Sequence, residues 1–244
     1  MSTLDKIQSV PSPNHNERVG GAADMLLLHY TGMETGEGAL ERLCDPAAQV
    51  SAHYLVFEDG RIVSMVDEDR RAWHAGVANW AGETDINSRS IGIEIVNPGH
   101  ELGYPDFPDV QIEAVTALAA DIVNRRGIAA ARVLAHSDVA PGRKADPGEK
   151  FPWGRLAEAS VGHWVSPIEP LEGPVLGLGD RGDQISELQF QLADFGYGIA
   201  VDGWFGEVTE NVVTAFQRHF RPAQVDGAAD LSTVGTLRLL RDAR

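Results

Sequence analysis

The sequence lacks the features that mark several large classes of protein. Its 244 residues include one cysteine, Cys44, so neither a disulfide framework nor a cysteine-rich zinc module is expected. The longest purely aliphatic run, residues 25–28, is far shorter than the roughly 20 residues of a membrane helix, which predicts a soluble protein without a membrane span. Basic residues are also scarce, 20 against 36 acidic ones, for a formal net charge of −16. Such a surface repels phosphate backbones, which excludes nucleic acid and anionic membranes as partners.

The first residues lack the pattern of an export signal. A signal peptide has a basic start followed by an apolar run of about 7–15 residues. Residues 1–24 are instead polar and contain Pro11, Pro13, Gly20 and Gly21, which predicts an irregular lead-in. Together with the single cysteine and the negative charge, this favours a cytoplasmic protein. A periplasmic or cell-wall location stays open, because a processed chain would look the same apart from Met1.

The first two thirds of the chain alternate strand and helix patterns. Strands are predicted at residues 24–30, 52–57, 61–66, 90–96 and 132–136, and an Asp-Gly turn at 59–60 predicts a hairpin between the second and third. Apolar residues at helical spacing predict a helix that Asp109 caps and Gly127 ends. The pattern predicts an α/β domain over residues 1–165, with a mixed central β-sheet flanked by helices.

The last third contains helical patterns only. Residues 166–176 are rich in proline and predict a semi-rigid linker. Over residues 177–244, apolar stripes at 185–192, 208–216 and 234–240 predict a small three-helix bundle. The triplet Val-Asp-Gly occurs at 201–203 and at 225–227, each time with a threonine seven residues after the aspartate. We expect the bundle to be a separate module, whose removal leaves a folded α/β domain.

Three residues have the types and positions of a metal site. His29 and His136 end predicted strands, and Asp146 follows His136 by ten residues in a loop rich in proline and glycine. Two imidazoles and one carboxylate suffice to hold Zn²⁺ with one position left for water. The sequence has no His-Glu-x-x-His motif, and a purely structural hydrogen-bonding role for the histidines stays open. In strand 90–96, Glu94 lies on the face opposite Ile91 and Ile93, where a carboxylate is unusual unless that face lines a site.

Four ordered motifs carry a resemblance to a known family. They are residues 28–31 (LHYT), 71–76 (RAWHAG), 90–94 (SIGIE), and 136–148 with Phe-Pro-Trp at 151–153. This set resembles the zinc-dependent N-acetylmuramoyl-L-alanine amidases of type 2, a superfamily that includes bacteriophage T7 lysozyme and peptidoglycan recognition proteins. The resemblance covers residues 10–160. It implies hydrolysis of the amide bond between N-acetylmuramoyl, or its 1,6-anhydro form, and L-alanine in peptidoglycan or muropeptides.

The resemblance also implies roles for single residues. His29, His136 and Asp146 would bind Zn²⁺, Glu94 would be the catalytic carboxylate, and Lys144 would face the scissile carbonyl. Which of Glu94 and Lys144 protonates the leaving amine stays open. Further substrate contacts are predicted for three residues, although packing explains the last two equally well: Tyr30, Trp73 and His74.

The C-terminal part has a resemblance of its own. Residues 175–242, through Val201–Gly206 and the second Asp-Gly at 226–227, resemble the three-helix peptidoglycan-binding domain. We predict a monomer whose partner is peptidoglycan or a muropeptide. Three alternatives stay open: a recognition protein that binds muropeptide without cleaving it, a phage-type endolysin that acts on intact wall, and a metal with a structural role only.

Overall fold

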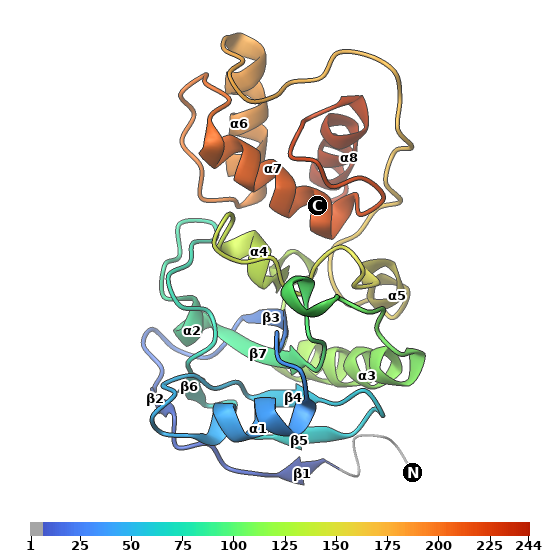
Figure 1. Cartoon of the computed structure of the whole chain (residues 1–244). Helices are drawn as coiled ribbons and strands as arrows, with labels where there is room; N and C mark the ends of the chain where they lie inside the picture. Colours follow the sequence, from blue (N-terminus) through green and yellow to red (C-terminus); the bar gives the residue numbers. More distant parts are fainter. Residues whose placement is uncertain (1–6) are drawn as a thin grey trace.

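A mixed six-stranded sheet forms the centre of the first two thirds of the chain (Figure 1). The computed structural model describes residues 7–244, so residues 1–6 of the predicted lead-in lie outside the described part. The strand order is β1-β5-β4-β7-β3-β8, with bounds β1 Gln8–Ser9, β3 Met25–Tyr30, β4 Tyr54–Val56, β5 Ile62–Ser64, β7 Ser90–Ile95 and β8 Val133–Ala135. Strand β3 pairs in parallel with β7 and β8, whereas β4 and β5 form the predicted antiparallel hairpin. The predicted α/β fold with a mixed sheet is confirmed.

Two short strands occupy the segment that was predicted to be irregular. Strand β1 extends the edge of the sheet, and β2 (His15–Glu17) pairs with β6 (Arg70–Ala72) in a separate antiparallel ribbon. The prediction of an irregular lead-in is therefore wrong for these residues. Their side chains are mostly exposed and polar, so backbone pairing holds the strands in place without an apolar alternation that the sequence could show.

The alternation of side chains along β3 and β7 separates the core from the site. One face packs on helix α3 (Asp109–Arg126) through five buried residues: Leu26, Leu28, Ile91, Ile93 and Ile95. The other face therefore carries His29 and, directly opposite it in the β3–β7 register, Glu94. Helix α3 ends at Gly127 as predicted, in the left-handed conformation, but Asp109 is its first residue and Pro108 precedes it.

Four shorter helices complete the α/β unit: α1 (Gly36–Cys44), α2 (Ile86–Arg89), α4 (His136–Val139) and α5 (Trp153–Glu158). Helix α1 was not predicted, because glycines at 36 and 38 weaken its helical pattern; the Thr35 hydroxyl caps it by accepting a bond from the Gly38 N–H. His136 begins α4 and does not end strand β8. No helix in residues 7–244 is long and apolar enough to cross a bilayer.

The C-terminal part is the predicted three-helix bundle of α6 (Asp183–Phe195), α7 (Glu207–Phe220) and α8 (Leu231–Asp242). The repeated Val-Asp-Gly triplet corresponds to a repeated structure. The Gln189 amide donates to Asp202 and to Thr209, and its carbonyl accepts from the backbone of residues 202 and 203. Gln217 makes the same bonds with Asp226, Thr233 and the backbone of residues 226 and 227. Each repeat is thus a turn that a buried glutamine joins to the start of the next helix.

The bundle packs directly on the α/β unit, with α7 over α4 (Figure 1). The edge of Trp80 meets Tyr197 at a ring-centroid distance of 5.0 Å, and one apolar cluster includes Leu27 and Leu134 of the sheet with Phe216 of α7. Residues 166–176 form no regular helix or strand, and Ile168 bonds Ser232 and Thr236 of α8. Because the bundle and the α/β unit share an apolar core, the structure does not favour the expectation of an independent module. The boundaries 1–165, 166–176 and 177–244 stay predictions.

A buried carboxylate, Glu68, links the strand region to α3. Its oxygens accept bonds from Arg125 (2.9 Å), Arg126 (2.7 Å) and the Tyr54 hydroxyl (2.7 Å). Burial favours the neutral acid, but these bonds outweigh it and lower the pKa of Glu68 to about 2. Since the pKa is lower in the folded than in the unfolded state, the stabilisation is complete above about pH 4.5 and is lost as the pH falls toward 2.

We therefore expect Glu68→Gln to lower the free energy of unfolding by up to about 3 kcal/mol at pH 7 and by much less at pH 2.5. Urea denaturation at the two pH values measures the difference. The control is Asp69→Asn, because the Asp69 side chain is 80% exposed and its ion pair with Arg126 contributes about 0–1 kcal/mol. An equal loss for Glu68→Gln at both pH values would contradict the assignment.

Candidate active site

A cleft of about 330 Å³ lies beside the carboxyl ends of β3, β7 and β8. Parallel strands commonly place ligand sites at this edge of a sheet. All residues that the sequence predicted for the site line this one cleft: His29, Tyr30, Trp73, His74, Glu94, His136, Lys144 and Asp146. The structure thus brings the predicted residues together, while their individual roles stay predictions.

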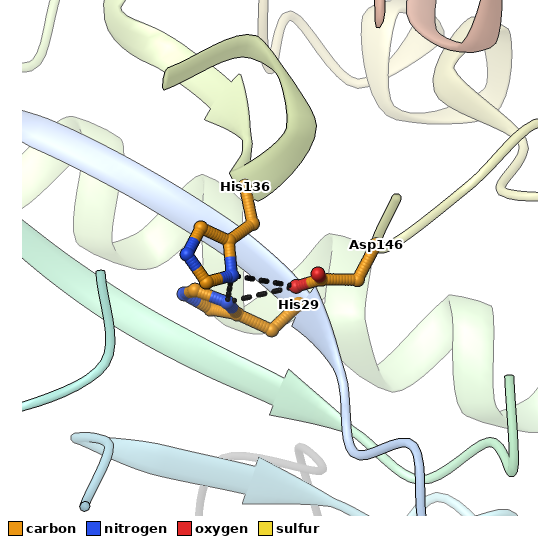
Figure 2. Close-up of side chains that lie close together, drawn as sticks. All are labelled: His29, His136 and Asp146. Carbon is orange, nitrogen blue, oxygen red and sulfur yellow. Dashed lines mark hydrogen bonds and ion pairs between the residues drawn. The ribbon is translucent and has the colours of Figure 1, made fainter. Parts of the chain in front are cut away.

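Three buried side chains converge at the base of the cleft (Figure 2). His29 comes from β3, His136 begins α4, and Asp146 lies in the loop that follows α4. The two Nδ1 atoms are 2.9 Å apart, and they lie 3.0 Å (His29) and 2.9 Å (His136) from Oδ2 of Asp146. One small cation could contact all three atoms at once.

The hydrogen bonds of the two Nε2 atoms indicate which ring nitrogens carry a proton. The other ring nitrogens then present lone pairs to the centre of the cluster. Nε2 of His136 lies 2.9 Å from the carbonyl oxygen of Ala75, which only accepts, so Nε2 carries the proton and Nδ1 is free to bind a metal. Nε2 of His29 lies 3.0 Å from Nδ1 of His74. When His74 carries its proton on Nε2, its Nδ1 accepts the N–H of His29, and Nδ1 of His29 is then also free to bind a metal. Burial and, second, His136 lower the pKa of His29 to about 4, which keeps its ring neutral at pH 7. Two imidazoles and one carboxylate are the ligand types that Zn²⁺ prefers, whereas Mg²⁺ and Ca²⁺ prefer oxygens.

His74 has a positioning role that sequence reasoning missed. Its ring lies between His29 and strand β7, where a Cβ atom on Gly92 would come within 2.6 Å of Nδ1. Only glycine at position 92 therefore leaves room for the His74 ring. The predicted substrate contact of His74 stays a prediction, because the side chain also lines the cleft.

Glu94 has a buried carboxylate oxygen whose loss of solvation no hydrogen bond from residues 7–244 offsets. Its Oε2 atom is buried and has no hydrogen-bond partner among the described residues. Burial, with Asp146 as a second cause, raises the pKa of Glu94 well above its usual range, and Lys144 opposes this shift. An unpartnered buried carboxylate lowers stability, so its presence in a cleft indicates a functional role. Lys144 is exposed and belongs to the same loop as Asp146.

The other two predicted substrate contacts, Tyr30 and Trp73, each form a hydrogen bond with another side chain. The Tyr30 hydroxyl lies 3.0 Å from Nδ1 of His100, and the Trp73 indole N–H donates to Asn16 at 2.6 Å. Sequence reasoning did not predict a role for Arg143, whose guanidinium donates to the carbonyls of Ala75 (2.5 Å) and of residue 77 (2.7 Å). Arg143 thereby fixes the carbonyl that orients His136.

Comparison with known proteins identifies the family of this chain. The N-acetylmuramoyl-L-alanine amidase family matches residues 19–149, more than half of the chain. The chain belongs to this family. A second family, described as a peptidoglycan binding domain, matches residues 181–237 of this amidase.

Two relatives of this amidase match different shares of the chain. N-acetylmuramoyl-L-alanine amidase AmiD of Escherichia coli is 38% identical over 223 residues, which are 86% of this chain and 79% of the relative. The 1,6-anhydro-N-acetylmuramyl-L-alanine amidase AmpD of Escherichia coli is 36% identical over 165 residues, 60% of this chain and 88% of the relative.

A solved structure of a relative covers nearly the whole of this amidase. The structure of Escherichia coli AmiD in complex with anhydro-N-acetylmuramic acid-L-Ala-D-γ-Glu-L-Lys superimposes with a TM-score of 0.79 at 34% identity, covering 93% of this chain and 92% of AmiD. The predicted enzyme class and the predicted two-part fold are therefore confirmed.

Proposed function

We propose that this amidase hydrolyses the bond between 1,6-anhydro-N-acetylmuramic acid and L-alanine in muropeptide fragments, with Zn²⁺ held by His29, His136 and Asp146. The observation that carries the proposal is the convergence of two Nδ1 atoms and one carboxylate oxygen beside an unpartnered Glu94. The complex of AmiD with an anhydro-muropeptide substrate supports the substrate class.

The residues around the cleft supply the remaining steps of amide hydrolysis. Bound zinc would provide Lewis-acid catalysis and lower the pKa of water toward 7. Glu94 accepts a proton from the attacking water, and Glu94 or Lys144 delivers a proton to the leaving amine. Lys144 stabilises the negative charge that develops on the scissile carbonyl oxygen. A purely structural metal is disfavoured, because structural zinc sites use four protein ligands and this cluster contains three.

The preference for fragments rests on charge. The net charge of −16 provides no attraction to a wall rich in anionic groups. The match to a peptidoglycan binding domain favours the alternative, action on intact wall. A cytoplasmic location belongs to the fragment hypothesis and stays a prediction with it. The monomeric state is a separate prediction.

Incubation of the enzyme with purified sacculi and, separately, with anhydro-muropeptides distinguishes the two substrates. We expect faster turnover of the fragments, with released peptide measured by mass spectrometry. The Glu94→Ala variant serves as the blank for both incubations. Rapid cleavage of sacculi with poor turnover of fragments would favour a wall-degrading, endolysin-type role.

A further inference from the structure

Asp138 is a carboxylate that lies wholly between the α/β unit and the bundle. Its side chain is 0% exposed. Its Oδ1 accepts the Tyr197 hydroxyl at 2.8 Å, and its Oδ2 lies 2.7 Å from Nδ1 of His219. Tyr197 follows α6 and His219 belongs to α7, so both of these side-chain partners come from the bundle.

The same carboxylate fixes the turn that presents the metal ligands. Oδ2 of Asp138 also accepts the backbone N–H of Ala135 at 2.8 Å, which closes the turn from β8 into α4, where His136 is the first residue. The backbone N–H of Ser137, two residues further on, donates to the carbonyl of Asp146 at 3.0 Å. The backbone positions of two of the three ligands therefore depend on this turn.

Helix α7 contacts the loop from α4 to α5 and the first residue of α5. The Trp153 ring stacks on His219 with a centroid distance of 3.7 Å and an interplanar angle of 22°. A Cβ atom on Gly142 would approach the Asn211 amide to 2.6 Å, and Arg218 lies 3.7 Å from Glu149. Helix α7 thus contacts the loop that carries Asp146 near both of its ends.

We propose that Tyr197 and His219 are positioning residues of the metal site, so that the bundle completes this site in addition to any contact with the wall. The inference rests on the proposed zinc site. A buried carboxylate that loses a donor keeps its desolvation penalty, and the turn that it holds relaxes. Outer partners of metal ligands commonly change metal affinity by about 10–100-fold.

The decisive variant is Tyr197→Phe in the full chain, which removes one hydroxyl and keeps the ring. We expect its zinc Kd to rise by about tenfold, in competition with a chromophoric chelator, and the visible absorption of the Co²⁺-substituted protein to shift. The matched control is Thr233→Val, which removes a buried hydroxyl that bonds Arg221 at 2.6 Å within the bundle. The control should lower thermal stability but leave the zinc Kd and the Co²⁺ spectrum unchanged.

A second pair of variants tests the other donor. His219→Asn keeps an N–H donor at the position of Nδ1 and should retain most of the zinc affinity. In His219→Leu, the zinc Kd should rise to the same extent as in Tyr197→Phe. An unchanged Kd and Co²⁺ spectrum in folded Tyr197→Phe and His219→Leu proteins would overturn the inference and leave the proposed function intact. A wild-type protein that binds no zinc would overturn the proposed metal site itself.

Discussion

Replacing Asp146 with alanine should remove both the bound zinc and the activity. The cluster has three protein ligands, and a site of that kind does not hold its metal firmly with two. His29→Ala and His136→Ala should have the same effect, with hydrolysis of an anhydro-muropeptide falling to background. Metal content of the purified variants and turnover of the fragment are the measurements.

A control variant and removal of the metal by a chelator complement the three ligand variants. Asp106→Ala removes an aspartate whose side chain is 88% exposed, and it should keep full zinc content and turnover. Treatment of the wild-type enzyme with a chelator should abolish turnover, and added Zn²⁺ should restore it. Normal turnover with full zinc occupancy in any ligand variant would refute the assignment.

Glu94→Ala should retain the metal while kcat falls by about 10²–10⁴-fold, the usual contribution of a general base. The variant also removes a buried oxygen that has no partner among the described residues. We therefore expect its melting temperature to be at least that of the wild type, because an uncompensated desolvation penalty disappears. Kinetics, zinc content and thermal unfolding separate these effects.

Two outcomes would contradict the role of Glu94. Loss of zinc in Glu94→Ala would show that Glu94 is a ligand, and unchanged kcat would show that another group accepts the proton. Glu94→Gln provides the matched comparison, because it keeps the shape and removes the charge; its kcat should fall as far as that of Glu94→Ala.

Much of the site was predictable because it follows from local patterns. The alternation along β3 and β7 places His29 and Glu94 on one face of the sheet, and their opposition follows from parallel pairing. The apolar stripes predicted the three helices of the bundle, although Val208, which belongs to one of these stripes, is 64% exposed. Strands β1, β2 and β6 were not predicted, because they consist mainly of polar residues. Backbone hydrogen bonds stabilise these strands, and such bonds are not apparent from the amino-acid composition.

The rest of the site depends on contacts between distant residues. Tyr197 and His219 reach Asp138 across 59 and 81 residues of sequence, and no local pattern links them. The role of His74 likewise depends on the space above Gly92, which only the assembled sheet reveals. Periodicity identifies the buried face of an element, but it does not identify the partner that covers this face.

The shared core beneath α7 constrains how such a chain can evolve. Trp80 is 2% exposed and Leu134 is 2% exposed, because the bundle and its neighbours cover this side of the α/β unit. Deleting the bundle at the gene level would turn this side into a contiguous apolar patch, which favours aggregation. We therefore expect a lineage that loses the bundle also to acquire polar substitutions on this side of the α/β unit.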